Sequence, residues 1–281
     1  MSKYYYLIAG LPDLTLEDNK LNYTVQSFRD ELYPQLSRSD KNLINLFYLN
    51  FDNSNLLALL KDSDAELAKE GLYSKDELLE LIDTIKLGET KPVGFPSYLV
   101  DFLYAYIDGK YEELPLLDNI LTGMYYRHAL KSKNKFINEW FTFNQTLNNL
   151  FIAFSARKHN FEFKEQLVGN DVITEQIKES NARDFGLSGT IDYLNVITRL
   201  VDEDELAVRE KQLDQIRWNW LEEKSFFHYF SIERLFVFLQ QIVMVERWLL
   251  LDKEEGNKYF RKIIDTLRGE VQLPVEFRKN K

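Results

Sequence analysis

Histidines and clustered carboxylates are the side chains of this sequence with the greatest potential for chemistry. The 281-residue chain has three histidines, His128, His159 and His228, and no cysteine. The histidines are far apart in the sequence and none has a partner at helical spacing, whereas a zinc site needs three or four converging ligands. The densest acidic run, residues 202–205, suits the start of a helix, where carboxylates complement the helix dipole. We therefore predict neither a metal centre nor a cofactor.

Two short segments imitate the motifs of enzymes. The triplet Asp-Phe-Gly at 184–186 matches the metal-binding triplet of kinases, but the glycine-rich loop and the His-Arg-Asp motif that position ATP are missing. The segment Gly-Leu-Ser-Gly at 186–189 is too short for the nucleophile elbow of hydrolases. No Walker or dinucleotide-binding motif occurs. We predict a non-catalytic protein, and the open alternative is a hydrolase or transferase whose dispersed carboxylates meet only on folding.

Glu246 is an acidic residue on the apolar face of a predicted helix. The apolar residues that share this face are Ile232, Leu235, Leu239, Ile242 and Leu249. A buried carboxylate must be hydrogen-bonded or ion-paired, and the expected partner is Arg247 or an arginine of another helix such as Arg157. The preferred interpretation is an ion pair that stabilises the fold, and a catalytic acid is the alternative.

Charge and composition disfavour several classes of partner. The chain has 35 Lys and Arg against 45 Asp and Glu, a net charge of −10. This balance argues against binding to nucleic acid or to an anionic membrane. The most apolar stretch, residues 226–251, contains several charged and amide side chains, so we predict no membrane span. The lack of cysteine, and of a small-residue cleavage site near the N-terminus, suits a cytoplasmic protein.

The elements that position these residues are predicted to be helices. Only 11 glycines and 6 prolines interrupt the chain, and most apolar residues recur at helical spacing. Ser74 and Glu77 form a capping box, and residues 116–158 form the longest periodic stretch, with a break at 132–134. The separate helices expected elsewhere include 39–50, 55–67, 232–251 and 256–267. Residues 4–9 predict one short strand, or an extended segment packed on helices.

The domain prediction is a single all-α domain, residues 1–281, built from several helical modules. Candidate internal boundaries lie near 89–97 and 181–190, where breakers gather. A weak internal repeat supports the modular interpretation, because residues 43–47 and 147–151 share four of five residues.

Three segments carry a resemblance to known families. The first runs over Asn138-Glu139-Trp140, Asn148-Asn149-Leu150 and Ala156-Arg157-Lys158; the second runs from Ile232-Glu233-Arg234 to Val245-Glu246-Arg247. Both resemble helices of the C subunit of bacterial and archaeal V/A-type ATPases, which is called subunit d in eukaryotes. The opening segment, Tyr4 to Pro12, resembles an uncharacterised bacterial family of this length that is encoded among V-type ATPase subunits.

The resemblance implies a non-catalytic helical subunit of three similar modules arranged as a funnel. In that family the funnel seats the central stalk on the membrane rotor ring, so the implied partners are other ATPase subunits. The implied location is cytoplasmic and peripheral to the membrane through the complex. Candidate structural or interaction residues are Asn149, Arg157, Lys158, Glu246 and Arg247. A helical scaffold unrelated to rotary ATPases is a further alternative.

Overall fold

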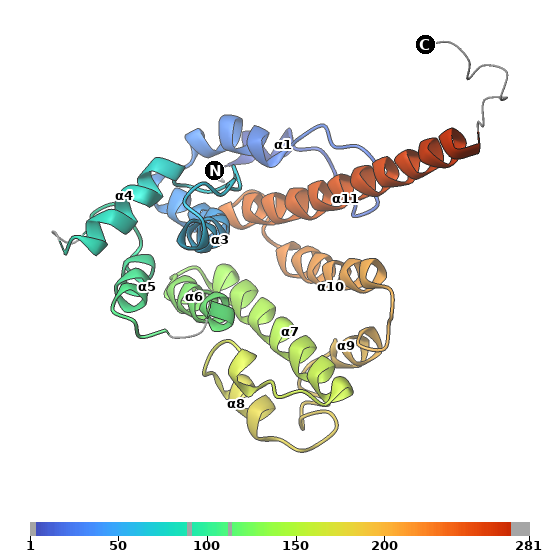
Figure 1. The fold of residues 1–281 in the computed structure, drawn as a ribbon. Helices are drawn as coiled ribbons and strands as arrows, with labels where there is room; N and C mark the ends of the chain where they lie inside the picture. Colours follow the sequence, from blue (N-terminus) through green and yellow to red (C-terminus); the bar gives the residue numbers. More distant parts are fainter. Residues whose placement is uncertain (1–3, 89–91, 112–113, 271–281) are drawn as a thin grey trace, which may run out of the picture.

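Helices form all the regular structure in the part of the chain that the structure describes (Figure 1). The structure is a computed structural model, and it describes residues 4–88, 92–111 and 114–270. The all-α prediction is confirmed. The helices are α1 Tyr5–Ala9, α2 Val25–Ser27, α3 Arg38–Lys61, α4 Lys75–Lys86, α5 Ser97–Ile107, α6 Leu114–Ala129, α7 Lys135–His159, α8 Val172–Glu179, α9 Leu194–Leu200, α10 Leu206–Ser225 and α11 Ile232–Glu270. Helix α2 continues through a π-helical turn, Phe28–Leu32, and a 3₁₀ turn, Tyr33–Gln35; a second 3₁₀ turn is Lys164–Gln166.

Several helices begin where the sequence places a capping residue. The Ser74 hydroxyl accepts a hydrogen bond from the amide of Glu77, whose carboxylate accepts one from the amide of Ser74, and this capping box starts α4. The side chain of Asn134 caps α7 by accepting from the amide of Ile137 at 3.1 Å, which confirms the break predicted at 132–134. These starts are local, so they can be predicted without knowledge of the fold.

The apolar stripe of α7 is the main seam of the core. Its members are Phe136, Trp140, Phe143, Leu147, Leu150 and Phe154, and all six side chains are buried. The prediction that this stripe packs against other helices is confirmed. At about 1.5–3 kcal/mol for each large apolar side chain removed from water, this stripe is a major contribution to stability.

The predicted strand at residues 4–9 is wrong, because Tyr5–Ala9 is the short helix α1. A strand needs a neighbour to satisfy its backbone, and the described chain contains no strand. A helical turn satisfies these groups locally, and the amide of Ile8 donates to the carbonyl of Tyr4 at 3.0 Å. Tyr4 is buried, and its hydroxyl donates to Asp40 and accepts from the amide of Ser37 at 3.2 Å. These contacts fix the N-terminal segment on the start of α3.

Helices α3 and α11 each replace two predicted helices. Residues 38–61 form one helix where 39–50 and 55–67 were expected, and it ends at Lys61, so the predicted end near 67 is wrong. Residues 232–270 form one helix that passes through Gly256. Asp52 and Asn55, which lie at the junction of the two expected helices, are buried within α3 and bind the following loop, so the helix continues through them. A single glycine inside a helix costs only about 1 kcal/mol, which a long helix tolerates.

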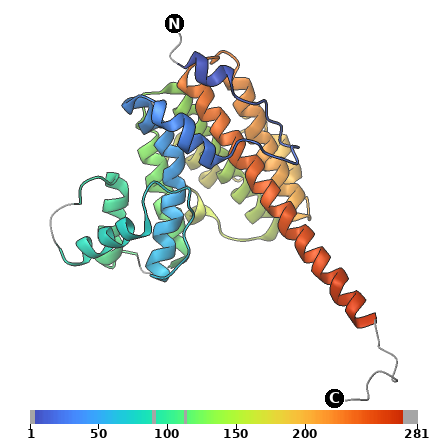
Figure 2. The same cartoon turned by 90° about the horizontal axis from the view of Figure 1, so that it is seen from above.

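Five helices form a closed ring in which each packs on its two neighbours. Helix α3 contacts α6 and α11, α7 contacts α6 and α10, and α10 contacts α11. Outside the ring, α5 packs on α6 and α4 packs on α5, while α8 and α9 pack on the outer side of α7 (Figures 1 and 2). The far end of α11 projects from the body. None of the helices in the described chain combines the length and apolar character that a bilayer crossing requires.

Candidate functional site

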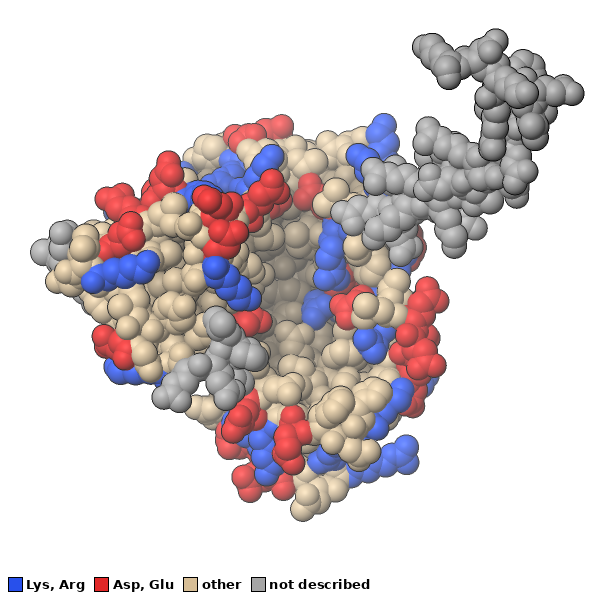
Figure 3. Space-filling view, in the orientation of Figure 1, with Lys and Arg blue, Asp and Glu red and all other residues tan. Residues whose placement is uncertain are grey.

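The ring encloses a central cleft to which all five of its helices contribute. The cleft has a volume of about 360 Å³ and is open to solvent on one face, where Figure 3 shows the molecule to be hollowed. Its aromatic wall consists of Phe47, Phe51, Tyr125, Tyr126, Trp140 and Phe141. Basic side chains lie along the inner edge formed by α10 and α11 (Figure 3). The cleft therefore combines a large aromatic surface with one positively charged edge.

A buried charge network occupies this edge. Asp214 of α10 is 2% exposed and accepts hydrogen bonds from Arg217 at 2.9 Å, from the indole nitrogen of Trp248 at 3.0 Å, and from Arg247. Arg217 also donates to the amide oxygens of Asn144 at 3.1 Å and Asn148 at 2.9 Å.

The network joins three helices of the ring and leaves the cleft with a positive charge. Its members come from α7, α10 and α11, so it holds these helices in register. One carboxylate and two guanidinium groups give a formal excess of one positive charge, in a chain whose net charge is −10. Arg247 remains about half exposed, so part of this charge is accessible from the open face.

Arg247 is the sequence-predicted residue that lies in the cleft, and its partner differs from the expected one. Arg247 pairs with Asp214 rather than with Glu246. Glu246 accepts a hydrogen bond at 3.1 Å from the amide of Val25, the first residue of α2. Burial raises the pKa of Glu246, and the Val25 amide partly offsets this effect. Glu246 therefore attaches α11 to the N-terminal segment.

Arg157 and Lys158, at the end of α7, contact a loop outside the cleft. Arg157 donates to the carbonyls of Ser180 and Ala182 at 2.5 Å, and its guanidinium lies 3.6 Å from the ring centroid of Phe185. Lys158 donates to the carbonyl of Val201 at 2.8 Å. These contacts hold the segment from Ser180 to Val201 on the ring. Phe185, of the kinase-like triplet, is fully buried as part of this packing.

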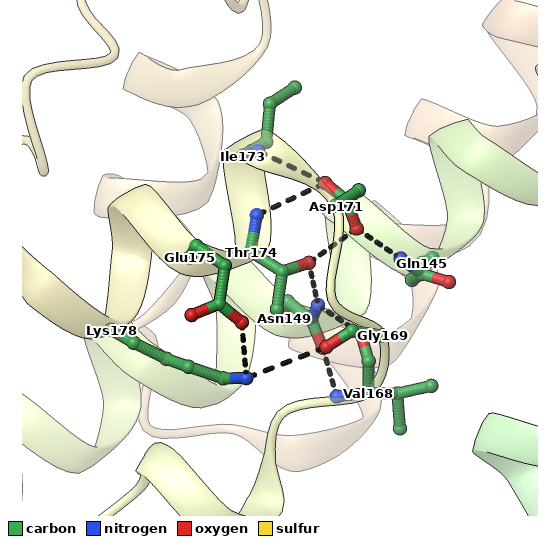
Figure 4. Close-up of polar contacts among 9 residues, drawn as sticks. All are labelled: Gln145, Asn149, Val168, Gly169, Asp171, Ile173, Thr174, Glu175 and Lys178. Atoms are coloured by element: carbon green, nitrogen blue, oxygen red, sulfur yellow. Dashed lines mark hydrogen bonds and ion pairs between the residues drawn. The ribbon is translucent and has the colours of Figure 1, made fainter.

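Asn149 binds the loop that precedes α8 (Figure 4). Its amide oxygen accepts from the amide of Val168 at 2.9 Å, and its amide nitrogen donates to the Val168 carbonyl at 2.7 Å and to the Thr174 hydroxyl at 3.0 Å. Asp171 caps α8 and also accepts from Gln145. We call the two-way bond between Asn149 and Val168 an Asn clamp.

A second Asn clamp occurs on α3. The amide oxygen of Asn55 accepts from the amide of Ala68 at 2.8 Å, and its nitrogen donates to the carbonyl of Ala68 at 3.0 Å. Each clamp asparagine precedes a fully buried leucine, and each clamped residue lies in the loop between a long ring helix and the next short helix. Helices α3 and α7 therefore anchor their loops in the same way.

The two clamped helices also present equivalent positions to the cleft. Phe47 and Asn50 precede Asn55 by the same intervals as Phe141 and Asn144 precede Asn149, and all four line the cleft. The weak repeat between residues 43–47 and 147–151 has a different register from this structural equivalence. In that alignment Asn45 would match Asn149, but Asn45 accepts from the hydroxyl of Tyr33 at 2.6 Å. The equivalence of these two helices is therefore in the clamp register and not in the register of the sequence repeat.

A family model with the description "Protein of unknown function (DUF2764)" matches residues 1–271. The chain belongs to this family. No curated protein and no solved structure matches the chain.

In this DUF2764 chain, Asp214 and Arg217 are the site residues that sequence reasoning missed. They are three residues apart on α10 and were not distinguished from other charged pairs on exposed helix faces. A usable signal was present, because an Asp-x-x-Arg pair puts both side chains on one face of a helix. The partners of Asp214 and Arg217 lie on α7 and α11, which are distant in the sequence, so these contacts could not be predicted.

The chemistry of the cleft favours binding. Asp214 is the one carboxylate among the described residues of the lining, and three donors already engage it. Searching the described residues for three or more clustered histidine, aspartate or glutamate ligands finds no group able to hold a metal ion. The accessible guanidinium of Arg247 beside aromatic rings suits a partner with an anionic group next to an apolar surface.

Proposed function

We propose that this chain is a non-catalytic coupling subunit or accessory factor of a V/A-type rotary ATPase, linking the central stalk to the membrane rotor ring. The first support is the resemblance of two segments to the C subunit of these ATPases. Those segments belong to α7 and α11, and they contribute Asn148 and Arg247 to the cleft. The N-terminal segment adds the resemblance to a family encoded among V-type ATPase subunits.

The observation that carries the proposal is the closed ring of five helices around one open cleft. A coupling subunit must transmit torque without deforming, and long helices packed on both sides provide that rigidity. It must also receive the end of another subunit, and a hollow open on one face offers a place for it. The two equivalent clamped helices agree with the modular construction that the resemblance implies.

The chemistry of the cleft refines the proposal. An excess positive charge within a strongly acidic protein favours a stalk segment with an acidic group, and the aromatic wall favours apolar side chains next to it. The alternative of an enzyme with dispersed carboxylates calls for several acids in one apolar pocket. Asp214 alone, held by two arginines, offers that alternative little support.

Co-purification from native membranes in mild detergent tests this proposal. The tagged chain is expected to bring down central-stalk and rotor-ring subunits, identified by mass spectrometry, and its deletion is expected to lower ATP-driven ion transport. A charge reversal, Arg247→Glu, is expected to weaken co-purification, whereas Arg183→Glu, in the loop held by Arg157, serves as the matched control. Recovery of no ATPase subunit, together with unchanged transport in the deletion strain, would refute the proposal.

A further inference from the structure

Six aromatic side chains form a continuous strip on the surface. They come from α1 and from the connection between α10 and α11: Tyr5, Tyr6, Phe226, Phe227, Tyr229 and Phe230. Their ring centroids follow one another at 5.5 Å from Tyr6 to Tyr5, 4.7 Å to Phe230, 6.4 Å to Tyr229, 6.3 Å to Phe226 and 5.0 Å to Phe227. We call this set the aromatic strip.

The strip is much more exposed than a monomer needs. Five of its six side chains are at least half exposed, and Tyr6 and Phe227 are 88% and 82% exposed. At roughly 200 Å² for each complete aromatic side chain, these fractions leave about 700 Å² of aromatic surface in water. The largest apolar patch of a typical monomer is about 300–600 Å² and is often functional. The aromatic strip therefore indicates an interface.

The strip is a surface distinct from the central cleft. Helix α1 and the α10–α11 connection lie together at the end of the ring where α11 begins, away from the projecting end of α11 (Figure 2). No residue of the strip lines the cleft. His228, within the same connection, instead packs on the ring of Phe136 at 5.4 Å. A partner bound to the strip would therefore leave the open face of the cleft accessible.

We propose that the aromatic strip is the contact surface between two copies of this chain, packed face to face about a two-fold axis. A stable interface of standard size buries about 800 Å² on each partner, which the strip and its rim would supply. Phe and Tyr rings pack well on other rings in edge-to-face geometry, so the strip is complementary to itself. The rim of the strip carries both a negative and a positive side chain, Glu223 and Lys224. A two-fold axis can therefore place Glu223 of one copy next to Lys224 of the other. This pairing is independent of any role in a rotary ATPase.

The state of association of the full chain tests the proposal. Sedimentation velocity from about 1 to 100 μM is expected to show a monomer–dimer equilibrium in this range. The double substitution Tyr6→Ser/Phe227→Ser is expected to raise the dissociation constant at least about tenfold, as for hot-spot aromatics. The matched control is Phe161→Ser/Val172→Ser, which removes side chains that are 69% and 83% exposed outside the strip. The control is expected to dimerise like the wild type.

Ionic strength provides a second measurement that does not depend on a variant that folds. Each copy carries a net charge of −10, so two copies repel each other and salt screens the repulsion. Dimerisation through aromatic rings is therefore expected to strengthen as salt rises. A wild type that stays monomeric over the whole range would overturn the proposal, and so would a dimer unaffected by the double substitution. Flotation of a monomer with phosphatidylcholine vesicles would overturn it in favour of a membrane surface.

Discussion

The carboxylates of Asp52, Asp214 and Glu246 are stabilised in different ways. Asp52 accepts only backbone amides, those of Leu72 at 3.0 Å and Tyr73 at 3.1 Å. Asp214 is paired with two guanidinium groups, and Glu246 accepts a single amide. Burial is the largest influence on both Asp52 and Glu246 and raises the pKa of each; the bonded amides, and Arg29 in the case of Asp52, only partly offset it.

Replacement of Asp52 with Asn is expected to change the pH dependence of stability. Burial raises the pKa of Asp52 to about 6, from an ordinary value of 3.8. A raised pKa means that the folded state binds the proton more tightly, so this stabilisation is complete below pH 4 and is lost as the pH rises through 6. At about 1.4 kcal/mol per pH unit, the loss amounts to roughly 3 kcal/mol.

Urea unfolding between pH 4 and pH 7 measures this effect. The stability of Asp52→Asn relative to the wild type is expected to rise by that amount across the range, because the amide does not titrate. The exposed Asp83→Asn serves as the control and should stay parallel to the wild type. Parallel curves for Asp52→Asn as well would contradict the raised pKa.

Replacement of Asp214 with Asn is expected to destabilise the fold by about 3 kcal/mol. The change leaves two arginines without their carboxylate, and removing one partner of a buried pair typically has a cost of this size. Arg247→Met removes a half-exposed partner and is expected to cost less, about 1 kcal/mol. Denaturant unfolding gives both values, and an Asp214→Asn variant as stable as the wild type would show that the network does not hold the helices together.

At the scale of the element, the Asn clamps fix each loop relative to its ring helix. The clamp asparagine satisfies both backbone groups of one loop residue, Ala68 or Val168, in a part-buried position. Both residues lie outside regular secondary structure, so no helix supplies partners for these groups. The asparagine side chain therefore supplies the donor and the acceptor that a neighbouring strand supplies in a β-sheet.

Asn55→Ala and Asn149→Ala are expected to destabilise the protein by similar amounts, about 2–3 kcal/mol each. Each substitution leaves the amide and the carbonyl of one loop residue without a hydrogen-bond partner. Each variant should speed amide hydrogen exchange in its own loop, near residue 68 or near residue 168. The control is Asn42→Ala, an exposed position on α3, which should change little. Equal exchange in both loops of each variant would mean that the clamps are not the local anchors.

The sequence predicted the elements best where the signal was local. The capping box of Ser74 and the break at 132–134 depend on residues within one helical turn, and the α7 stripe follows helical periodicity, so these features were predicted correctly. The continuity of α3 was missed, because Asp52 and Asn55, at the junction of the two expected helices, bind a loop that the local sequence does not reveal. The composition of residues 4–9 is typical of a strand, but the described residues contain no strand with which this segment could pair, and it forms a helix instead.

The candidate site was predictable only in part. Arg247 was singled out beside Glu246, but its partner Asp214 lies on another helix, and Arg217 reaches across to α7. These contacts exist because the ring closes, and pairing between distant helices leaves no pattern in a single sequence. Lys158 and Asn149 were singled out through the resemblance, and Arg157 also as a possible partner of Glu246. The structure places all three on loop contacts around α7, and Arg157 binds the carbonyls of Ser180 and Ala182 instead of Glu246.

The whole molecule is expected to unfold in one cooperative step. Each ring helix packs on two neighbours, so removal of any one exposes the faces of two others. Scanning calorimetry should therefore give a single transition whose calorimetric and van't Hoff enthalpies agree. If the chain were divided into independent units near 89–97 or 181–190, calorimetry would instead show two separable transitions. Limited proteolysis at those loops would then release stable fragments.

The closure of the ring by α11 has a consequence for synthesis on the ribosome. The chain is made from the N-terminus, and α11, which packs against both α3 and α10, emerges last. Until then the growing polypeptide keeps the inner faces of α3 and α10 bare, and Val25 lacks the carboxylate of Glu246. The nascent chain should consequently gain most of its stability only after translation of α11 has begun. Nascent chains stalled before it should depend on chaperones and be cleared rapidly by proteases.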